Sequence, residues 1–480
     1  MGRERFPGAL PRAVTYHPFR VKISENDFLP IPYWKRINTS DHVELRTVLT
    51  LTYHFPPSSA SGSFRLLGFA RHLPSHGWRA AVVAPPGLPW EPTDPGLLAQ
   101  VPPETVVYSA PYLTSRVARK FAKYKGWFPR ALRAAEKAIR EQKPEAIFTS
   151  GPPHQIHWLG LWLKRRHGLP WVADFRDPWY SEARLERGKT FESRWISSQE
   201  SLVMRHADAV IANAPGACKQ LCDAYPQHRS KFVTLPNGYD REKFEGLAAE
   251  VEPRQPGAPL RLVHAGAIYV GRDPLPVLDA VKRVSEGAEP VALDVRFFGP
   301  PPENGMDLGR EIEARGLCDR VKLHGQVSYA KALREMASAD VLLLMDSPGR
   351  TVGVPAKLYE YIGAGRPILA LGEQGGDLAL VLEQSGLPYR IAPPGDASAI
   401  ATALVELLKA STDQSDRPAR DGHKFSREAI AGQLADLLNR CARIREGEPP
   451  GEPNSEARRE PRPPELRTEE HDAPVLIVEC

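Results

Sequence analysis

The sequence predicts an α/β protein built from two Rossmann-like, doubly wound domains that face each other across a cleft. Three observations lead to this prediction. The chain has 480 residues, which is enough for two or three domains. Apolar runs of strand length alternate with helical patterns, the order that builds a parallel sheet. The alternation stops in a polar, proline-containing stretch at 238–259 and then starts again, so we place the domain linker there.

The first half of the chain carries the first series of these units. Residues 1–45 show no clean periodicity, and we expect them to be an N-terminal extension. A strand (RTVLTLTYHF), a turn (PPSSASGS), a helix (FRLLGFARHL) and a second strand (WRAAVVAP) follow. The pattern recurs with a helix at 129–142, strands EAIFTS and PWVADF around the helix IHWLGLWLKRRHG, a helix at 198–205 and the strand ADAVIAN. We therefore predict one domain over 46–237.

The second half repeats the pattern from the strand LRLVHAG onward. Further strands are LDVRFFG, VKLHG, DVLLLM and RPILAL, each separated from the next by a helical segment. This alternation predicts a second Rossmann-like domain over 260–425. A closing helix at 426–445 is expected to cross back to the first domain. The tail at 446–480 is rich in proline and acidic residues, and we expect it to be disordered.

The composition is that of a globular protein in a reducing compartment. Of the residues, 42% are hydrophobic and 25% charged, and the five cysteines form no CxxC pair. We therefore expect no disulfide framework and no zinc site. The amino terminus lacks a signal-peptide core, and no apolar run approaches the roughly 20 residues that span a bilayer. These features predict a cytoplasmic protein.

A basic segment at 115–140 stands out from the modest net charge of +5. Cations alternate there with aromatic residues, a composition that suits an anionic membrane surface. A merely solvated basic helix and a nucleic-acid site are the alternatives. Because no zinc finger, RRM signature or basic zipper accompanies the segment, we expect a membrane surface and no nucleic acid.

The loops after the two first strands argue against a dinucleotide-dependent oxidoreductase. They read HFPPSSASGS and HAGAIYVGRD, and neither contains GxGxxG. The chain also has no DxD motif and no metal-ligand spacing of histidines and cysteines, so we expect neither a metal nor a cofactor.

Seven stretches then match one family in order and spacing. They are YHFPPSSASGSFR, TSGPPHQIHWLG, PWVADFRDPW, ADAVIANAP, LPNGYD, HAGAIYVGRDPLPVLDAV and VGVPAKLYEYIGAGRPILAL. Over residues 46 to 443 the chain resembles the retaining GT-B glycosyltransferases of glycosyltransferase family 4. The resemblance implies transfer of a sugar from a nucleotide donor, with UDP the commonest carrier, to an acceptor without a metal.

Two cations are candidates for holding the donor diphosphate, whose charge grows as it leaves the sugar. Arg272 lies in the loop after the first strand of the second domain. Lys357 is expected on the first turn of a helix opened by Pro355, where helix amides also attract anions. The family resemblance assigns both to the diphosphate. The alternative for each is a solvated surface cation.

The same resemblance assigns Glu360 to the ribose, as the second glutamate of an E-x7-E pair. The first glutamate is absent, because its position is Val352. We interpret this as a change in contacts to the donor sugar. Gly353 and its neighbouring amides are expected to complete the phosphate cradle. The alternative for Glu360 is a surface carboxylate paired with Lys357.

In the first domain, the resemblance equates the loop containing Gly62 with the loop that approaches the donor phosphate or the acceptor. A plain turn is the alternative. His154 and Asp177 follow two strands and are the acid–base candidates. The alternatives are a hydrogen-bonded loop histidine and an ion pair between Asp177 and Arg176 or a cap. In the family the leaving phosphate is often credited with the proton transfer.

These observations predict a glycosyltransferase that extends a lipid-linked or polysaccharide acceptor at the inner face of a membrane. A sugar-nucleotide epimerase on the same scaffold is the second hypothesis. A non-catalytic scaffold that binds a nucleotide or a partner protein is the third, and only Val352 supports it.

Overall fold

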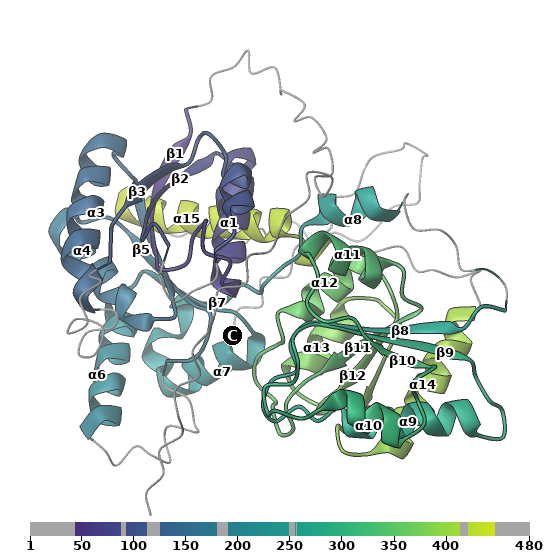
Figure 1. Cartoon of the computed structure of the whole chain (residues 1–480). Coiled ribbons are helices and arrows are strands. Elements are labelled where there is room, and N and C mark those ends of the chain that lie inside the picture. The colour runs from purple at the N-terminus through teal and green to yellow at the C-terminus, as the bar shows by residue number, and fades with distance from the viewer. Residues whose placement is uncertain are drawn as a thin grey trace, which may run out of the picture. The chain divides into compact units, whose positions relative to one another are not determined.

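The computed structural model describes residues 44–87, 93–112, 125–179, 191–248, 255, 257–412 and 421–446. These residues form two parallel β-sheets, each with helices on both faces, which confirms the predicted fold class (Figure 1). The N-terminal extension up to residue 43, residues 115–124 of the basic segment and the tail from residue 447 lie outside the described residues. None of the helices in the described ranges is both long enough and apolar enough to cross a membrane.

The first sheet has seven strands in the order β3-β2-β1-β4-β5-β6-β7. The strands are β1 (Arg46–Thr52), β2 (Trp78–Ala84), β3 (Val106–Ser109), β4 (Ala146–Gly151), β5 (Trp171–Phe175), β6 (Ala209–Ala212) and β7 (Phe232–Thr234). All of its strand pairs are parallel. Since β1 pairs with both β2 and β4, the strand order reverses direction beside β1, and ligands of such sheets collect at the carboxyl ends of the strands there.

Helices cover both faces of this sheet because its strands alternate apolar residues between two cores. The helices of the first half around this sheet are α1 (Ser61–His72), α3 (Phe128–Gln142), α4 (His157–His167), α6 (Phe191–His206) and α7 (Pro215–Ala224), whereas α8 (Arg241–Ala248) packs with the second sheet. Leu49 and Leu51 of β1 pack with α3, α4 and α7, whereas Val48 packs with α1. Helix α3 buries three alanines against the sheet at helical spacing.

The second sheet has six parallel strands in the order β10-β9-β8-β11-β12-β13. They are β8 (Leu260–Ala265), β9 (Leu293–Phe298), β10 (Val321–Leu323), β11 (Val341–Met345), β12 (Ile368–Leu371) and β13 (Tyr389–Ala392). The helices around it are α9 (Leu275–Glu286), α10 (Leu308–Ala314), α11 (Tyr329–Ala337), α12 (Lys357–Ala364), α13 (Asp377–Gln384) and α14 (Ala397–Thr412). Its strand order reverses beside β8, as the first sheet's does beside β1.

The closing helix α15 (Arg427–Glu446) returns to the first sheet, as expected. It packs against α1, and Ile430, Leu434 and Leu438 join the core that contains Val48. The chain crosses back next to Tyr239, whose N–H donates to the carbonyl of Phe425.

Several elements differ from the sequence prediction. Strands β3, β7 and β13 were not predicted. All three are short edge strands, and polar or exposed residues interrupt the apolar pattern of β3 and β13. Helix α8 lies inside the segment predicted as a linker, and its Phe244 and Leu247 are buried. Helix α6 begins at Phe191, seven residues before the predicted start. Helix α12 begins at Lys357, so Pro355 precedes the helix.

Short 3₁₀ helices connect several of these elements: η2 (Leu73–His76), η3 (Pro95–Gln100), η4 (Lys125–Trp127), η5 (His154–Ile156), η6 (Pro226–Lys231) and η7 (Asp421–Phe425).

Candidate functional site

The candidate residues of the second domain gather where strands β8 and β11 end. His264 is the fifth residue of β8, and Arg272 lies in the loop that follows this strand. Lys357 and Glu360 are on the first turn of α12, after β11. The charge of Arg272 contributes to a lowered pKa of Lys357, so the two cations are electrostatic neighbours. The two donor cations predicted from the sequence therefore lie at the switch point of the sheet.

Lys357 is held by a neutral histidine. The Nδ1 of His264 lies 2.9 Å from the carbonyl oxygen of Leu343, so this nitrogen carries the proton and donates it. Burial, followed by the charge of Lys357, lowers the pKa of His264 well below its usual value, and the ring is neutral at pH 7. Its Nε2 therefore presents a lone pair to the Nζ of Lys357, 3.4 Å away.

A glycine makes the space in which this lysine lies. A Cβ added to Gly266, which has a φ of +130°, would lie 2.6 Å from the Nζ of Lys357. Burial and the charge of Arg272 lower the pKa of Lys357 to about 7, against an opposing effect of Glu360. At neutral pH the lysine is thus close to losing its proton, and an anionic ligand would restore the charge.

Arg272 belongs to a cluster of two arginines and one buried aspartate. Its Nη2 lies 3.5 Å from Oδ1 of Asp346, and Nη1 of Arg350 lies 3.3 Å from the same oxygen. Asp346 is 2% exposed and directly follows β11. Within the described residues, the buried Nε of Arg272 and Oδ2 of Asp346 have no hydrogen-bond partner. A cluster with one carboxylate and two guanidinium groups keeps a net positive charge that suits an anion.

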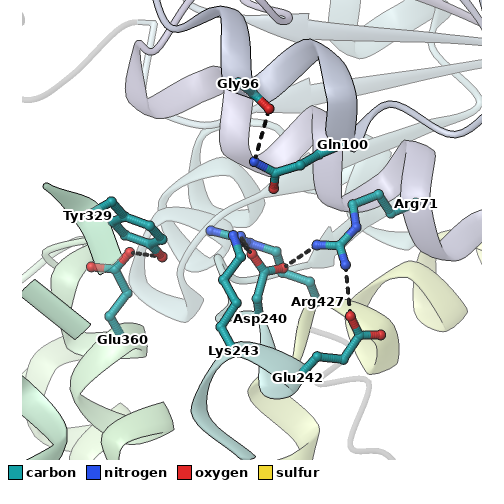
Figure 2. Close-up of polar contacts among 9 residues, drawn as sticks. All are labelled: Arg71, Gly96, Gln100, Asp240, Glu242, Lys243, Tyr329, Glu360 and Arg427. Atoms are coloured by element: carbon teal, nitrogen blue, oxygen red, sulfur yellow. Dashed lines mark hydrogen bonds and ion pairs between the residues drawn. The ribbon is translucent and has the colours of Figure 1, made fainter. Parts of the chain in front are cut away.

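Glu360 makes a different contact from the one considered from the sequence. Its Oε1 accepts a hydrogen bond of 2.9 Å from the hydroxyl of Tyr329, the first residue of α11 (Figure 2). The alternative of an ion pair with Lys357 is not what the structure shows, because that lysine faces His264 instead. Burial raises the pKa of Glu360, and the charge of Arg427 opposes this rise.

The loop before α12 is fixed by a buried carboxylate, and this differs from the expected phosphate cradle. The N–H of Gly353 donates to Oδ2 of Asp377 at 2.6 Å, so this amide is already engaged. Oδ1 of Asp377 accepts from the N–H of Gly216, on the first turn of α7, also at 2.6 Å. Val352, in place of the missing glutamate, packs against the apolar core of the first sheet. Asp377 therefore joins this loop to the first domain.

Gly62 lies on the first turn of α1 and not in the preceding loop, which corrects the expectation. A Cβ added there would overlap the guanidinium of Arg176. Arg176 donates to the carbonyl oxygens of Gly151 and Pro152 at 3.0 and 2.8 Å. The glycine thus makes room for a buried cation at the carboxyl edge of the first sheet.

Arg65, in the same helix as Gly62, does not contribute an uncompensated charge at that edge. Its guanidinium forms two hydrogen bonds to the buried carboxylate of Asp174, at 3.1 and 3.0 Å. Asp174 also accepts from the hydroxyl of Ser150 at 2.7 Å. Arg65 and Asp174 therefore form a buried structural pair that ties β5 to α1.

The two acid–base candidates lie in unlike surroundings. His154 is 7% exposed, and its ring stacks on Phe175 and Trp179 with centroids 5.2 and 5.3 Å away. Asp177 is exposed, two residues after the end of β5. Because β4 and β5 are neighbours, both residues lie at the same edge of the first sheet. His157 is fully buried, and its Nδ1 contacts the hydroxyl of Thr149 at 2.8 Å.

Five residues of this site were not singled out from the sequence: Tyr329, Asp346, Asp377, His264 and Arg350. Two of them carry a signal that sequence analysis offers. Asp346 is an acidic residue directly after a wholly apolar strand, and His264 is a polar residue inside an apolar one. Tyr329 and Asp377 gain their roles from partners far away along the chain, which the sequence pattern does not reveal. No three His, Cys, Asp or Glu side chains of the described ranges are grouped so as to hold a metal ion.

Two consecutive segments of the chain match known families. Residues 63–238 match the family described as Glycosyl transferase 4-like domain, and residues 260–410 match the family described as Glycosyl transferases group 1. The first segment includes His154 and Asp177. The second includes Arg272, Lys357 and Glu360.

Two curated relatives match parts of the chain. It is 25% identical to a D-inositol 3-phosphate glycosyltransferase of Geodermatophilus obscurus over 274 residues, which cover 54% of this chain and 60% of the relative. It is 28% identical to a phosphatidyl-myo-inositol mannosyltransferase of Mycobacterium leprae over 186 residues, which cover 38% of this chain and 45% of the relative. The matches span less than two thirds of either relative's length.

A solved structure shares the fold. The crystal structure of Anabaena HepE in complex with UDP has a TM-score of 0.55 to this chain, at 16% sequence identity, and the match covers 82% of this chain and all of that one.

Proposed function

We propose that this chain, a glycosyltransferase with the GT-B fold, transfers a sugar from a UDP-sugar to a lipid-linked or polysaccharide acceptor, with retention and without a metal ion. One observation carries the proposal. Arg272, Arg350 and Lys357 converge at the switch point of the second sheet, inside the segment that matches the group 1 family. Three cations in one place suit a leaving diphosphate.

In this mechanism the bond between the anomeric carbon of the sugar and the diphosphate oxygen breaks. A bond from the same carbon to the acceptor oxygen forms on the same face. Negative charge grows on the diphosphate as it leaves. Arg272 and Lys357 therefore stabilise the transition state more strongly than the ground state. Glu360 binds the ribose hydroxyls through its carboxylate oxygens.

The proton of the acceptor hydroxyl needs a destination. We propose that an oxygen of the leaving diphosphate, on the same face of the sugar, accepts this proton. Asp177 and His154 are the protein groups that could accept it instead or help to transfer it. Asp177 is exposed, whereas His154 is buried between aromatic rings. Asp177→Asn and His154→Gln, assayed separately, distinguish these roles. Loss of a dedicated base should lower kcat by about 100-fold or more.

We propose that the enzyme reaches its acceptor at an anionic membrane surface. The described part of the basic segment lies on α3, where Arg133, Lys137 and Arg140 are exposed along one side while alanines face the sheet. The name of the Mycobacterium leprae relative, phosphatidyl-myo-inositol mannosyltransferase, includes a lipid. We assign the first domain, to which α3 belongs, to the acceptor, and this cationic helix would hold the enzyme beside such a lipid.

The two other hypotheses from the sequence are not favoured. Both family matches are to glycosyltransferases, and neither is to an epimerase. Val352, the only support for a non-catalytic scaffold, is accommodated by its packing against the first core.

A binding screen tests the donor part. Purified protein is titrated by calorimetry with UDP, GDP, ADP and dTDP in EDTA, and hydrolysis of the corresponding sugar nucleotides is followed by NMR. We expect UDP to bind without metal, and the sugar released from its UDP donor to keep the anomeric configuration. Absence of UDP binding, or binding only after a divalent cation is added, would overturn the proposal.

A further inference from the structure

A tyrosine on a neighbouring helix orients the carboxylate assigned to the donor ribose. The hydroxyl of Tyr329, at the start of α11, donates to Oε1 of Glu360, on the first turn of α12, over 2.9 Å. Figure 2 shows the second carboxylate oxygen of Glu360 directed away from the tyrosine. Within the described residues, that second oxygen forms no hydrogen bond or ion pair.

Tyr329 is itself held from three sides. Its ring stacks on Phe64 of α1, with centroids 6.0 Å apart, and the Nζ of Lys243 lies 5.1 Å from its ring centroid. Lys243 and Arg427 both form ion pairs with the buried carboxylate of Asp240, at 2.7 and 2.5 Å. Arg427 also lies over the ring of Phe64, 5.9 Å from its centroid. The tyrosine hydroxyl therefore has little freedom to turn away from Glu360.

The charges around the pair keep its hydrogen bond in one direction. Burial, followed by the negative charge of Glu360, raises the pKa of Tyr329 well above its usual value, so the hydroxyl stays protonated and donates. Burial raises the pKa of Glu360, but Arg427, the hydrogen bond from Tyr329 and Lys243 oppose the rise, while Asp240 adds to it. Glu360 is thus an acceptor whose position the tyrosine fixes.

Fixing this carboxylate matters for recognition of a diol. A glutamate has three side-chain torsions, and a ligand that must order them loses part of its binding free energy. An oxygen that accepts one hydrogen bond from Tyr329 still has a second lone pair, and the other oxygen adds two more. The carboxylate can therefore keep its bond to the tyrosine while it accepts both hydroxyls of a ribose.

We propose that Tyr329 is a positioning residue for donor recognition, which holds Glu360 so that the site prefers ribonucleotides to 2′-deoxyribonucleotides. This inference rests on the proposed role of Glu360 in binding the donor. Because Phe64 of α1 stacks on Tyr329, the preference for ribonucleotides would also depend on α1 of the first domain.

The test compares Tyr329→Phe with wild type. The variant keeps the ring, its stacking on Phe64 and its contact with Lys243, and it loses only the hydroxyl. Affinity is measured by calorimetry for the tightest of UDP, GDP and ADP, and for the matching 2′-deoxynucleotide. We expect about tenfold weaker binding of the ribonucleotide, a smaller loss for the deoxynucleotide, which offers Glu360 only its 3′-hydroxyl, and a raised KM with kcat within about twofold of wild type.

Two further variants separate the possible results. Tyr359→Phe is the matched control. Tyr359 precedes Glu360 in the sequence, and its buried hydroxyl has no hydrogen-bond partner within the described residues. If that variant loses as much affinity as Tyr329→Phe, the inference is wrong. Glu360→Ala tests the underlying assignment, and unchanged affinity there would overturn the proposed donor role itself. Weaker binding in Glu360→Ala together with wild-type discrimination in Tyr329→Phe would overturn only the inference about Tyr329.

Discussion

The Nζ of Lys357 lies 3.4 Å from Nε2 of His264, and the other ring nitrogen of that histidine is committed to the carbonyl of Leu343. A neutral histidine can accept a hydrogen bond from the lysine but cannot neutralise its charge. The site thus holds a partly buried cation that lacks a full counter-charge. Such an arrangement costs stability in the empty protein and favours an anionic ligand.

Diphosphate affinity should fall as the pH rises through about 7. Burial lowers the pKa of Lys357 to about 7, so the free protein loses this charge above that pH. A bound anion raises the pKa again, so binding takes up a proton, and the Kd for UDP should rise by up to about tenfold per pH unit above 7. Below about pH 6 this group adds no pH dependence. Calorimetry at pH 6, 7, 8 and 9 measures the slope, with Lys357→Arg as the control that stays charged. An equal slope in that variant would contradict the assignment to Lys357.

Lys357→Met should weaken diphosphate binding by about tenfold or more and raise the thermal stability of the empty protein. The pKa of Lys357 is lowered on folding, so the unfolded chain binds more protons between about pH 7 and 10.5. The lysine therefore penalises folding fully below pH 7, and the penalty disappears toward pH 10. Thermal unfolding of both proteins without ligand should show the largest difference at pH 7 and below, and a smaller one toward pH 10. A variant that is less stable than wild type at pH 7 would contradict the prediction.

Gly62→Ala should destabilise the protein by about 1–3 kcal/mol, because the added methyl displaces the guanidinium of Arg176 from its two carbonyl acceptors. Gly246→Ala is the matched control, since an added Cβ there meets open space. Urea unfolding measures both variants. The substitution at Gly62 should cost much less in an Arg176→Ala background, and equal costs in the two backgrounds would rule out this explanation.

Asp240→Asn should lower stability by about 3 kcal/mol at pH 7, because three cations lose their buried partner. Burial alone would raise the pKa of Asp240, but Arg427, Lys243 and Arg71 hold it well below its usual range. The stabilisation is therefore fully present above about pH 4 and is lost as the pH falls toward the pKa of the folded state. Urea unfolding from pH 7 to 3 should show the gap between wild type and variant narrowing at the acid end. A gap that stays constant would contradict this assignment.

Lys137→Glu with Arg140→Glu on α3 should reduce binding to vesicles of anionic phosphatidylglycerol by about tenfold or more, since each cation near such a surface contributes about 1 kcal/mol. The control carries Lys282→Glu with Arg283→Glu on α9, which changes the net charge equally on another exposed helix. Vesicle sedimentation at low and high salt measures both. Equal losses in the two variants would show that net charge, and not α3, governs the attraction.

The sequence by itself determined the element order, the two-domain fold class and the positions of Arg272, Lys357 and Glu360 near strand ends. Alternating apolar patterns are local, so they can be identified without knowing which residues pack together. Parallel strands bring their carboxyl ends to one edge of the sheet. Local patterns failed for β3 and β13, because edge strands expose residues that central strands bury. They failed for α8 because, among its described side chains, only Phe244 and Leu247 of that polar helix reach the core.

Only the tertiary structure decided what those side chains contact. Asp377 accepts from Gly216 across 161 positions of the sequence, and Tyr329 reaches Glu360 from another helix. The lowered pKa of Lys357 likewise depends on burial and on Arg272, which no spacing rule encodes. Burial and the direction of a hydrogen bond arise from residues distant in the chain, so they become defined only when the sheets and helices have packed.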